Sequence, residues 1–229
     1  MTQGFKDAKA QLVEAACLHV PFDGWSEATF EAAVADSGLD PVMARAICPR
    51  GGVDLALAYH LAGDQKMLDR LADTDLSALR YSERITAAVR FRLEAVEDKE
   101  LVRRGTTLFA LPTYAADGAK AIWGTCDAIW EALGDTSRDG NWYSKRATLA
   151  GVYSSTVLYW LGDDSPDHAA TWEFLDRRIE NVMAFEKFKA QARENPLLKP
   201  LMAGPAFLME RLKAPERRSD MPGSFGARR

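Results

Sequence analysis

Hydrophobic and small residues recur along this chain every three or four positions, and strand-like alternation does not. In the middle of the chain these positions advance in steps of four and three, which keeps them on one face of a helix. They are Ala115, Ala119, Ile122, Cys126, Ile129 and Leu133. Similar stripes within 85–96 and 172–185 predict two more helices. The pattern therefore predicts an all-α protein.

Breaks rich in glycine and proline divide the stripes into about nine or ten helices. They fall at 21–25, 38–41, 49–52, 73–77, 111–114, 134–140 and 162–166. Short connections of this kind are typical of helical bundles. At the last break, Ser165, Pro166 and Asp167 predict a helix start, because serine caps, proline suits the first turn and aspartate favours the positive helix end.

The first third of the chain has the spacing of a helix-turn-helix. Ser26 is placed to cap one helix, residues 37–40 (SGLD) predict a tight turn, and a short helix begins at Pro41. Because a long helical body follows, this spacing resembles the architecture of TetR-type regulators. We therefore expect a TetR-like helical bundle with an N-terminal helix-turn-helix.

The charges of this helix-turn-helix do not suit DNA. Residues 21–50 hold five acids against two bases, which gives −3. The candidate recognition helix, 41–46, offers one cation, Arg45. Because DNA binding needs cations that face phosphates and donors that face bases, we expect a structural helix-turn-helix and no nucleic-acid partner.

The composition is that of an ordinary globular chain. Its 229 residues are 47% hydrophobic and 27% charged, with a net charge of −4, so no overall positive field attracts nucleic acid. The three cysteines are odd in number and far apart, which fits a reducing compartment. The longest uncharged run, 147–162, is shorter than the roughly 20 residues of a spanning helix, and the first residues do not resemble a signal peptide. We therefore expect a cytoplasmic protein.

We divide the chain into four regions. Residues 1–75 form a helix-turn-helix-like subdomain and 76–192 a helical body. Residues 193–213 form an amphipathic segment, and 214–229, with proline, glycine and arginine, form a disordered tail.

No motif for catalysis or metal binding is present in the sequence. The three histidines, His19, His60 and His168, have no spacing typical of a metal site, and no nucleophile motif or phosphate-binding loop is found. A structural or solvated role is the simpler interpretation of each histidine. We expect a protein that is not an enzyme and that needs no cofactor or metal.

Five of the six tryptophans lie between residues 123 and 172. A well-packed core explains such a set, since aromatic side chains dominate core burial. The alternative is a long apolar cavity between helices, where bundles commonly hold ligands.

The block from Gly140 to Ile179 resembles the signature of a known family, the coenzyme Q (ubiquinone) biosynthesis accessory proteins of the Coq-nine family, in its α-proteobacterial type. The matching pieces are Asn141-Trp142-Tyr143, Lys145-Arg146-Ala147, Leu149-Ala150, Asp164-Ser165-Pro166-Asp167, Thr171-Trp172 and Phe174-Leu175. The likeness extends upstream to about Gly24, through "GWSEATFEAAVADSGL", Arg92-Leu93 and Leu111-Pro112.

The resemblance implies a non-catalytic homodimer of TetR-like fold that binds an isoprenoid or quinone lipid. It also implies presentation of that lipid to the di-iron demethoxyubiquinone hydroxylase. For the lipid site we expect apolar residues of the helical body, namely Leu108, Leu111, Ile122, Trp123, Cys126, Ile129, Trp130, Leu149, Val152 and Tyr153. The alternative is a TetR-like transcriptional regulator with an apolar effector.

Two surfaces follow from the same resemblance. Trp142, Tyr143 and Arg146 become a docking patch for the partner protein, since such residues are common interface anchors; without the resemblance they are the end of an amphipathic helix. The C-terminal segment becomes a peripheral contact with the inner membrane, or else a docking helix followed by a solvated tail. Its expected membrane contacts are Leu197, Leu198, Leu201, Met202, Phe207 and Leu208.

Overall fold

The computed structural model describes residues 3–194, and in this part of the chain it contains ten α-helices, one 3₁₀ turn and no strand. The all-α prediction and the expected number of helices are confirmed. In order the elements are α1 Gln3–Cys17, α2 Val20–Asp23, α3 Glu27–Ser37, α4 Pro41–Ile47, α5 Gly52–Asp73, α6 Tyr81–Glu94, α7 Lys99–Ala110, α8 Ala115–Ala132, α9 Gly140–Leu161, η1 Pro166–His168 and α10 Ala169–Glu194.

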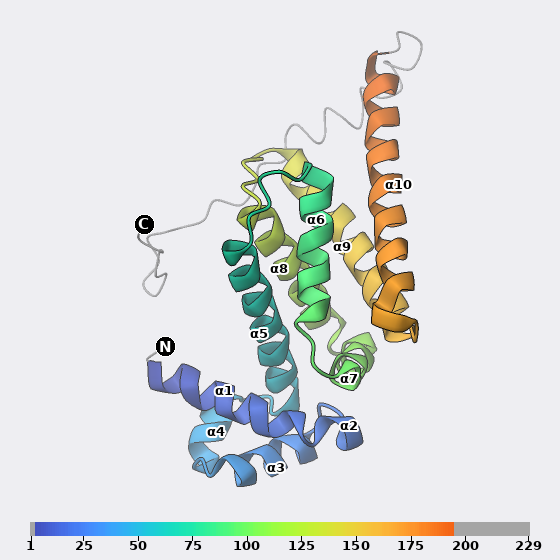
Figure 1. Ribbon diagram of the computed structural model, residues 1–229. Helices are drawn as coiled ribbons and strands as arrows, with labels where there is room; N and C mark the ends of the chain where they lie inside the picture. The colour runs from blue at the N-terminus through green and yellow to red at the C-terminus, as the bar shows by residue number, and fades with distance from the viewer. Residues whose placement is uncertain (1–2, 195–229) are drawn as a thin grey trace.

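The first four helices gather at one end of the molecule (Figure 1). The side chain of Ser26 caps α3 by accepting from the amide of Thr29, and Asp40 caps α4 in the same way from Met43. Gly38 ends α3 with a φ of 66°, a left-handed conformation that glycine adopts without steric cost. The predicted helix-turn-helix is therefore formed by α3 and α4, and α1 packs across both of them.

Helix α5 leads from this end into a body made with α6, α8, α9 and α10 (Figure 1). Leu55 and Ala56 near its start belong to the core of the first helices, whereas Met67 and Leu71 near its end belong to the core of the body. Between these two cores α5 carries Tyr59, His60 and Asp64, and α7 packs against α2, α8 and α9. This junction contains the candidate site.

The start of α10 differs from the expectation. The sequence predicted a helix from Ser165, but Asp167 and His168 have φ values of 51° and 56°, and α10 begins at Ala169. Asp163 holds this turn, since its carboxylate accepts from the amides of Ser165 and Thr171 and from the Thr171 hydroxyl. These hydrogen bonds keep the pKa of Asp163 well below its usual range. No helix in the described part of the chain is long and apolar enough to cross a bilayer.

Candidate functional site

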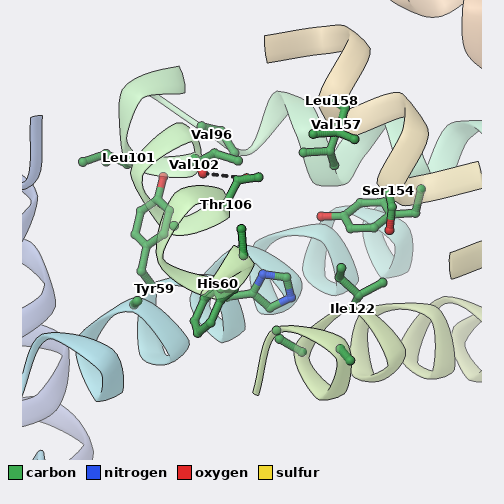
Figure 2. Close-up of a pocket in the computed structure, with 18 of the residues that line it drawn as sticks. Tyr59, His60, Val96, Leu101, Val102, Thr106, Ile122, Ser154, Val157 and Leu158 are labelled. Atoms are coloured by element: carbon green, nitrogen blue, oxygen red, sulfur yellow. Dashed lines mark hydrogen bonds between the residues drawn. The ribbon is translucent and has the colours of Figure 1, made fainter. Parts of the chain in front are cut away.

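An apolar cavity of about 410 Å³ lies between α5, α6, α7, α8 and α9. Figure 2 shows Tyr59 and His60 on one side of it and Ser154, Val157 and Leu158 on the other. Its volume is within the range of small-molecule sites, which are mostly apolar with a few polar groups. The lining residues that remain exposed are all apolar: Ala110, Ala115, Ala119 and Leu158. They place the mouth between the α7–α8 connection and α9.

Helix α7 supplies one wall because its apolar and small positions share a face. Leu101, Gly105 and Phe109 follow one another at steps of four and all line the cavity. Gly118 lets α8 approach this wall, since a Cβ there would lie 2.7 Å from the Cβ of Phe109. Trp25 joins the wall from the N-terminal end, where its indole N–H donates to the carbonyl oxygen of Leu101 at 3.0 Å.

A buried ion pair lies behind the opposite wall. The Arg92 guanidinium donates from Nε to Asp64 Oδ1 at 2.7 Å, and both side chains are more than nine-tenths buried. Arg92 also donates to the carbonyl oxygen of His60 at 3.0 Å. Gly63 leaves room for this guanidinium, because a Cβ there would approach Arg92 Cζ to 2.6 Å. Asp64 thus neutralises the charge of Arg92, which is one of the residues that line the cavity.

His60 is connected to the same ion pair through Thr125. The Thr125 hydroxyl lies 3.0 Å from both carboxylate oxygens of Asp64 and 2.8 Å from His60 Nε2. A hydroxyl has one hydrogen, and the carboxylate can only accept, so Thr125 donates to Asp64 and His60 Nε2 donates to Thr125. Burial lowers the pKa of His60, which keeps its imidazole neutral near pH 7. This polar wall therefore presents no net charge to the cavity.

Only two of the ten residues predicted to bind lipid, Ile122 and Tyr153, line this cavity. The second half of the stripe on α8 packs instead against α5, α6 and α9 in the core of the body. The other eight lie elsewhere: Cys126, Ile129, Trp130, Leu149 and Val152 in the core of the body, Leu108 against the N-terminal core, Leu111 half-exposed after α7, and Trp123 beside Trp142.

Most of the lining was not predicted from the sequence. The unpredicted residues are Tyr59 and His60 from α5, Arg92 from α6 and the face of α7. A signal was available for α7, since its apolar and small residues at 101, 105 and 109 stand opposite Arg103. The contribution of α5 had no local signal, because His60 lies in a helix whose apolar residues point to two different cores.

The structure places the three residues of the predicted docking patch differently. Trp142 and Tyr143 are half-buried and make an aromatic group with Trp123, with ring centroids 4.7 Å apart between Trp142 and Tyr143 and 5.8 Å between Trp123 and Trp142. Arg146 does not belong to the surface. Its side chain is 1% exposed and donates to Asp127 at 2.6 Å and to Asp135 at 3.1 Å, so it connects α8 and the α8–α9 loop to α9.

Asp135 is the centre of this local network. Burial disfavours its charge, but hydrogen bonds from Lys145, Ser137 and Arg146 outweigh burial and lower the pKa of Asp135 to about 2. Arg146 in turn lies 4.0 Å from the ring centre of Trp142. The network therefore fixes the guanidinium against which the Trp142 ring packs.

The two arginines of the helix-turn-helix region form ion pairs with acidic side chains. Arg45 is paired with Glu27 and lies over the ring of Phe30, and Arg50 is paired with Asp54 and Asp117, each at 2.9 Å. Within residues 3–194, no three His, Cys, Asp or Glu side chains form a group that could hold a metal ion. The six residues expected to contact a membrane, from Leu197 to Leu208, lie outside the described residues.

Comparison with known proteins finds similarity to COQ9 proteins. Residues 115–186 match the family model of COQ9. The chain is 27% identical over 197 residues to "Probable ubiquinone biosynthesis protein coq9, mitochondrial" of Dictyostelium discoideum, covering 82% of the chain and 64% of that protein. It is 30% identical over 188 residues to the COQ9 protein of Drosophila melanogaster, covering 80% and 57%, and 33% identical over 184 residues to COQ9-A of Xenopus laevis, covering 76% and 57%. The chain thus spans about three fifths of the length of these relatives.

The fold matches a solved regulator structure. The TetR transcriptional regulator from Nitrosomonas europaea superposes with a TM-score of 0.62 at 19% identity, covering 78% of this chain and 97% of the regulator. The TetR-like fold and the resemblance to the Coq-nine family are confirmed.

Proposed function

We propose that this chain, similar in sequence to the COQ9 proteins and in fold to a TetR regulator, is a non-catalytic lipid-binding accessory protein of ubiquinone biosynthesis. The observation that carries the proposal is the apolar cavity between α5 and α9. Burial of apolar surface contributes about 25 cal/mol per Å², so an isoprenoid chain gains free energy by leaving water for such a site. The charge pattern of α3 and α4 supports a function other than DNA binding.

The proposal includes an isoprenoid or quinone intermediate as the bound lipid, a homodimer, and presentation of the lipid to the di-iron hydroxylase. It also includes a cytoplasmic location with peripheral contact to the inner membrane. Trp142 and Tyr143, with Trp123, are the proposed contact to the hydroxylase, because half-buried aromatic residues commonly anchor interfaces. Arg146 has a supporting role there, since it lies beneath Trp142.

Lipid binding is tested by blocking the mouth of the cavity. Ala119→Trp adds an indole at a lining position of α8, whereas Ala116→Trp adds the same group one turn away, at an exposed position that does not line the cavity. Native mass spectrometry of the purified proteins should detect a co-purifying isoprenoid or quinone lipid with the parent and with Ala116→Trp, and much less with Ala119→Trp. Two results together would overturn the proposal. They are a purified parent protein that carries no lipid, and a deletion strain whose ubiquinone content is unchanged.

A further inference from the structure

Two tyrosines at the cavity, Tyr59 and Tyr153, have hydroxyls that form no hydrogen bond within the described part of the chain. Tyr153 is 4% exposed and Tyr59 is half-buried, and both line the cavity. Neither hydroxyl makes a hydrogen bond with any residue that the structure describes. Neither oxygen is among the buried polar atoms without a partner, so each keeps accessible surface, and both side chains line the cavity, where a ligand can satisfy them.

The polar groups around them are already satisfied. Arg92 is bonded to Asp64, and His60 donates to Thr125, which donates to Asp64. Burial raises the pKa of Tyr59 to about 12 and also raises the pKa of Tyr153, so both hydroxyls stay protonated near pH 7. Each can therefore donate one hydrogen bond and accept another.

The charge of the lining limits what these hydroxyls can bind. Arg92 is the one formally charged residue among the described residues that line the cavity, and it is neutralised by Asp64. A carboxylate or phosphate taken into this site would lose its hydration without gaining a free cation. An uncharged group with a hydroxyl or carbonyl oxygen would lose less and would satisfy the tyrosines.

We propose that Tyr59 and Tyr153 hold the uncharged, oxygen-bearing head of an amphiphile. Its apolar tail points toward the mouth, past Ala119 and Leu158, because the exposed lining residues are all apolar and the polar ones are buried or half-buried. This inference rests on the proposed lipid binding and adds the class of head group and the residues that select it.

Three compounds with the same ring and tail test the inference: decylbenzene, 4-decylphenol and 4-decylbenzoate. Their affinities are compared by displacement of the fluorescent probe N-phenyl-1-naphthylamine from the full chain. We expect the phenol to bind about 5- to 10-fold more tightly than decylbenzene, the size of one or two hydrogen bonds. The benzoate should bind more weakly than the phenol. In Tyr153→Phe and Tyr59→Phe the preference for the phenol should fall, while the affinity for decylbenzene is retained.

Tyr159→Phe is the matched control, because Tyr159 is an exposed tyrosine of the same helix as Tyr153 and does not line the cavity. It should keep the preference of the parent. Since the Tyr153 hydroxyl has no hydrogen-bond partner among residues 3–194, Tyr153→Phe should not lower the melting temperature, which separates loss of a ligand contact from loss of fold. Equal binding of phenol and decylbenzene by the parent, a preference for the benzoate, or a preference that survives the double change Tyr59→Phe and Tyr153→Phe would overturn the inference and leave lipid binding intact. Failure of all three compounds to bind would overturn both.

Discussion

Arg146 was predicted to lie on a docking surface, but the structure places it in the interior. Its neighbours Trp142 and Tyr143 are half-buried, but its own guanidinium is buried between Asp127 and Asp135. Removal of one partner of a buried ion pair leaves the other charges uncompensated. Arg146→Met should therefore lower the free energy of unfolding in urea by about 3–5 kcal/mol. Arg177→Met, at an exposed arginine of α10, should change it by less than about 1 kcal/mol; a similarly small effect at Arg146 would contradict the assigned role.

The same network predicts a dependence on pH. The folded pKa of Asp135, about 2, lies below the ordinary value for aspartate, so its contribution to stability is present above about pH 4. The contribution is lost as pH falls through the folded pKa. The stability difference between the parent and Asp135→Asn should therefore shrink by about 2 kcal/mol between pH 5 and pH 2. Unfolding curves across this range check the expectation, and a constant difference would be inconsistent with it.

Among the helices, α5 depends on a close backbone contact at its first residue. A Cβ on Gly52 would lie 2.4 Å from the carbonyl oxygen of Ser26 and 2.6 Å from that of Trp25, and backbone atoms cannot rotate away. Gly52→Ala should therefore destabilise the protein by at least about 1–3 kcal/mol, the usual cost of overpacking. Gly124→Ala should stabilise it by about 0.5–1 kcal/mol, because Gly124 is exposed inside α8 with open space at the Cβ position. Thermal melts compare the two, and equal effects would refute the steric argument.

Helix boundaries were predictable where a cap lies next to the helix it caps. Ser26, Asp40 and Asp139 each accept from an amide two or three residues ahead, which is a pattern visible in the sequence. The start of α10 was not predictable in this way. Its amide at Thr171 is satisfied by Asp163, eight residues earlier, across a turn with two left-handed residues. Such a contact depends on a conformation that spacing does not reveal.

For the whole molecule, the fold alone does not decide the function, and the charge pattern is evidence against DNA binding. The TetR-like fold supplies a helix-turn-helix, but Arg45 and Arg50 are occupied by acids. DNA binding requires free cations that release counterions from phosphates. We expect no mobility shift of promoter DNA from the protein's own gene at 50 mM salt. A shifted band that weakens as salt is raised would instead favour a transcriptional regulator.

The cavity was the part of the molecule that the sequence predicted least well. The aromatic-rich helices α8 and α9 drew attention to the correct region, and Ile122 and Tyr153 do line the cavity. The remaining lining comes mainly from α5, α6 and α7, and one helical stripe cannot show where its contact with a neighbour ends. Periodicity identifies the buried face of one helix. A cavity forms where the buried faces of several helices do not pack against one another.

The position of α5 has a consequence for folding. With 22 residues it spans about 33 Å, and the cavity lies where one core ends and the other begins. The buried apolar residues form separate clusters on the two sides of this level, so the two ends of the helix belong to different packed units. A molecule bound there touches Trp25 and Ala56 from the first core and Ile122 from the second. The ligand would then fill the space between the two cores. Its binding would couple the unfolding of the two ends of the molecule into one cooperative transition.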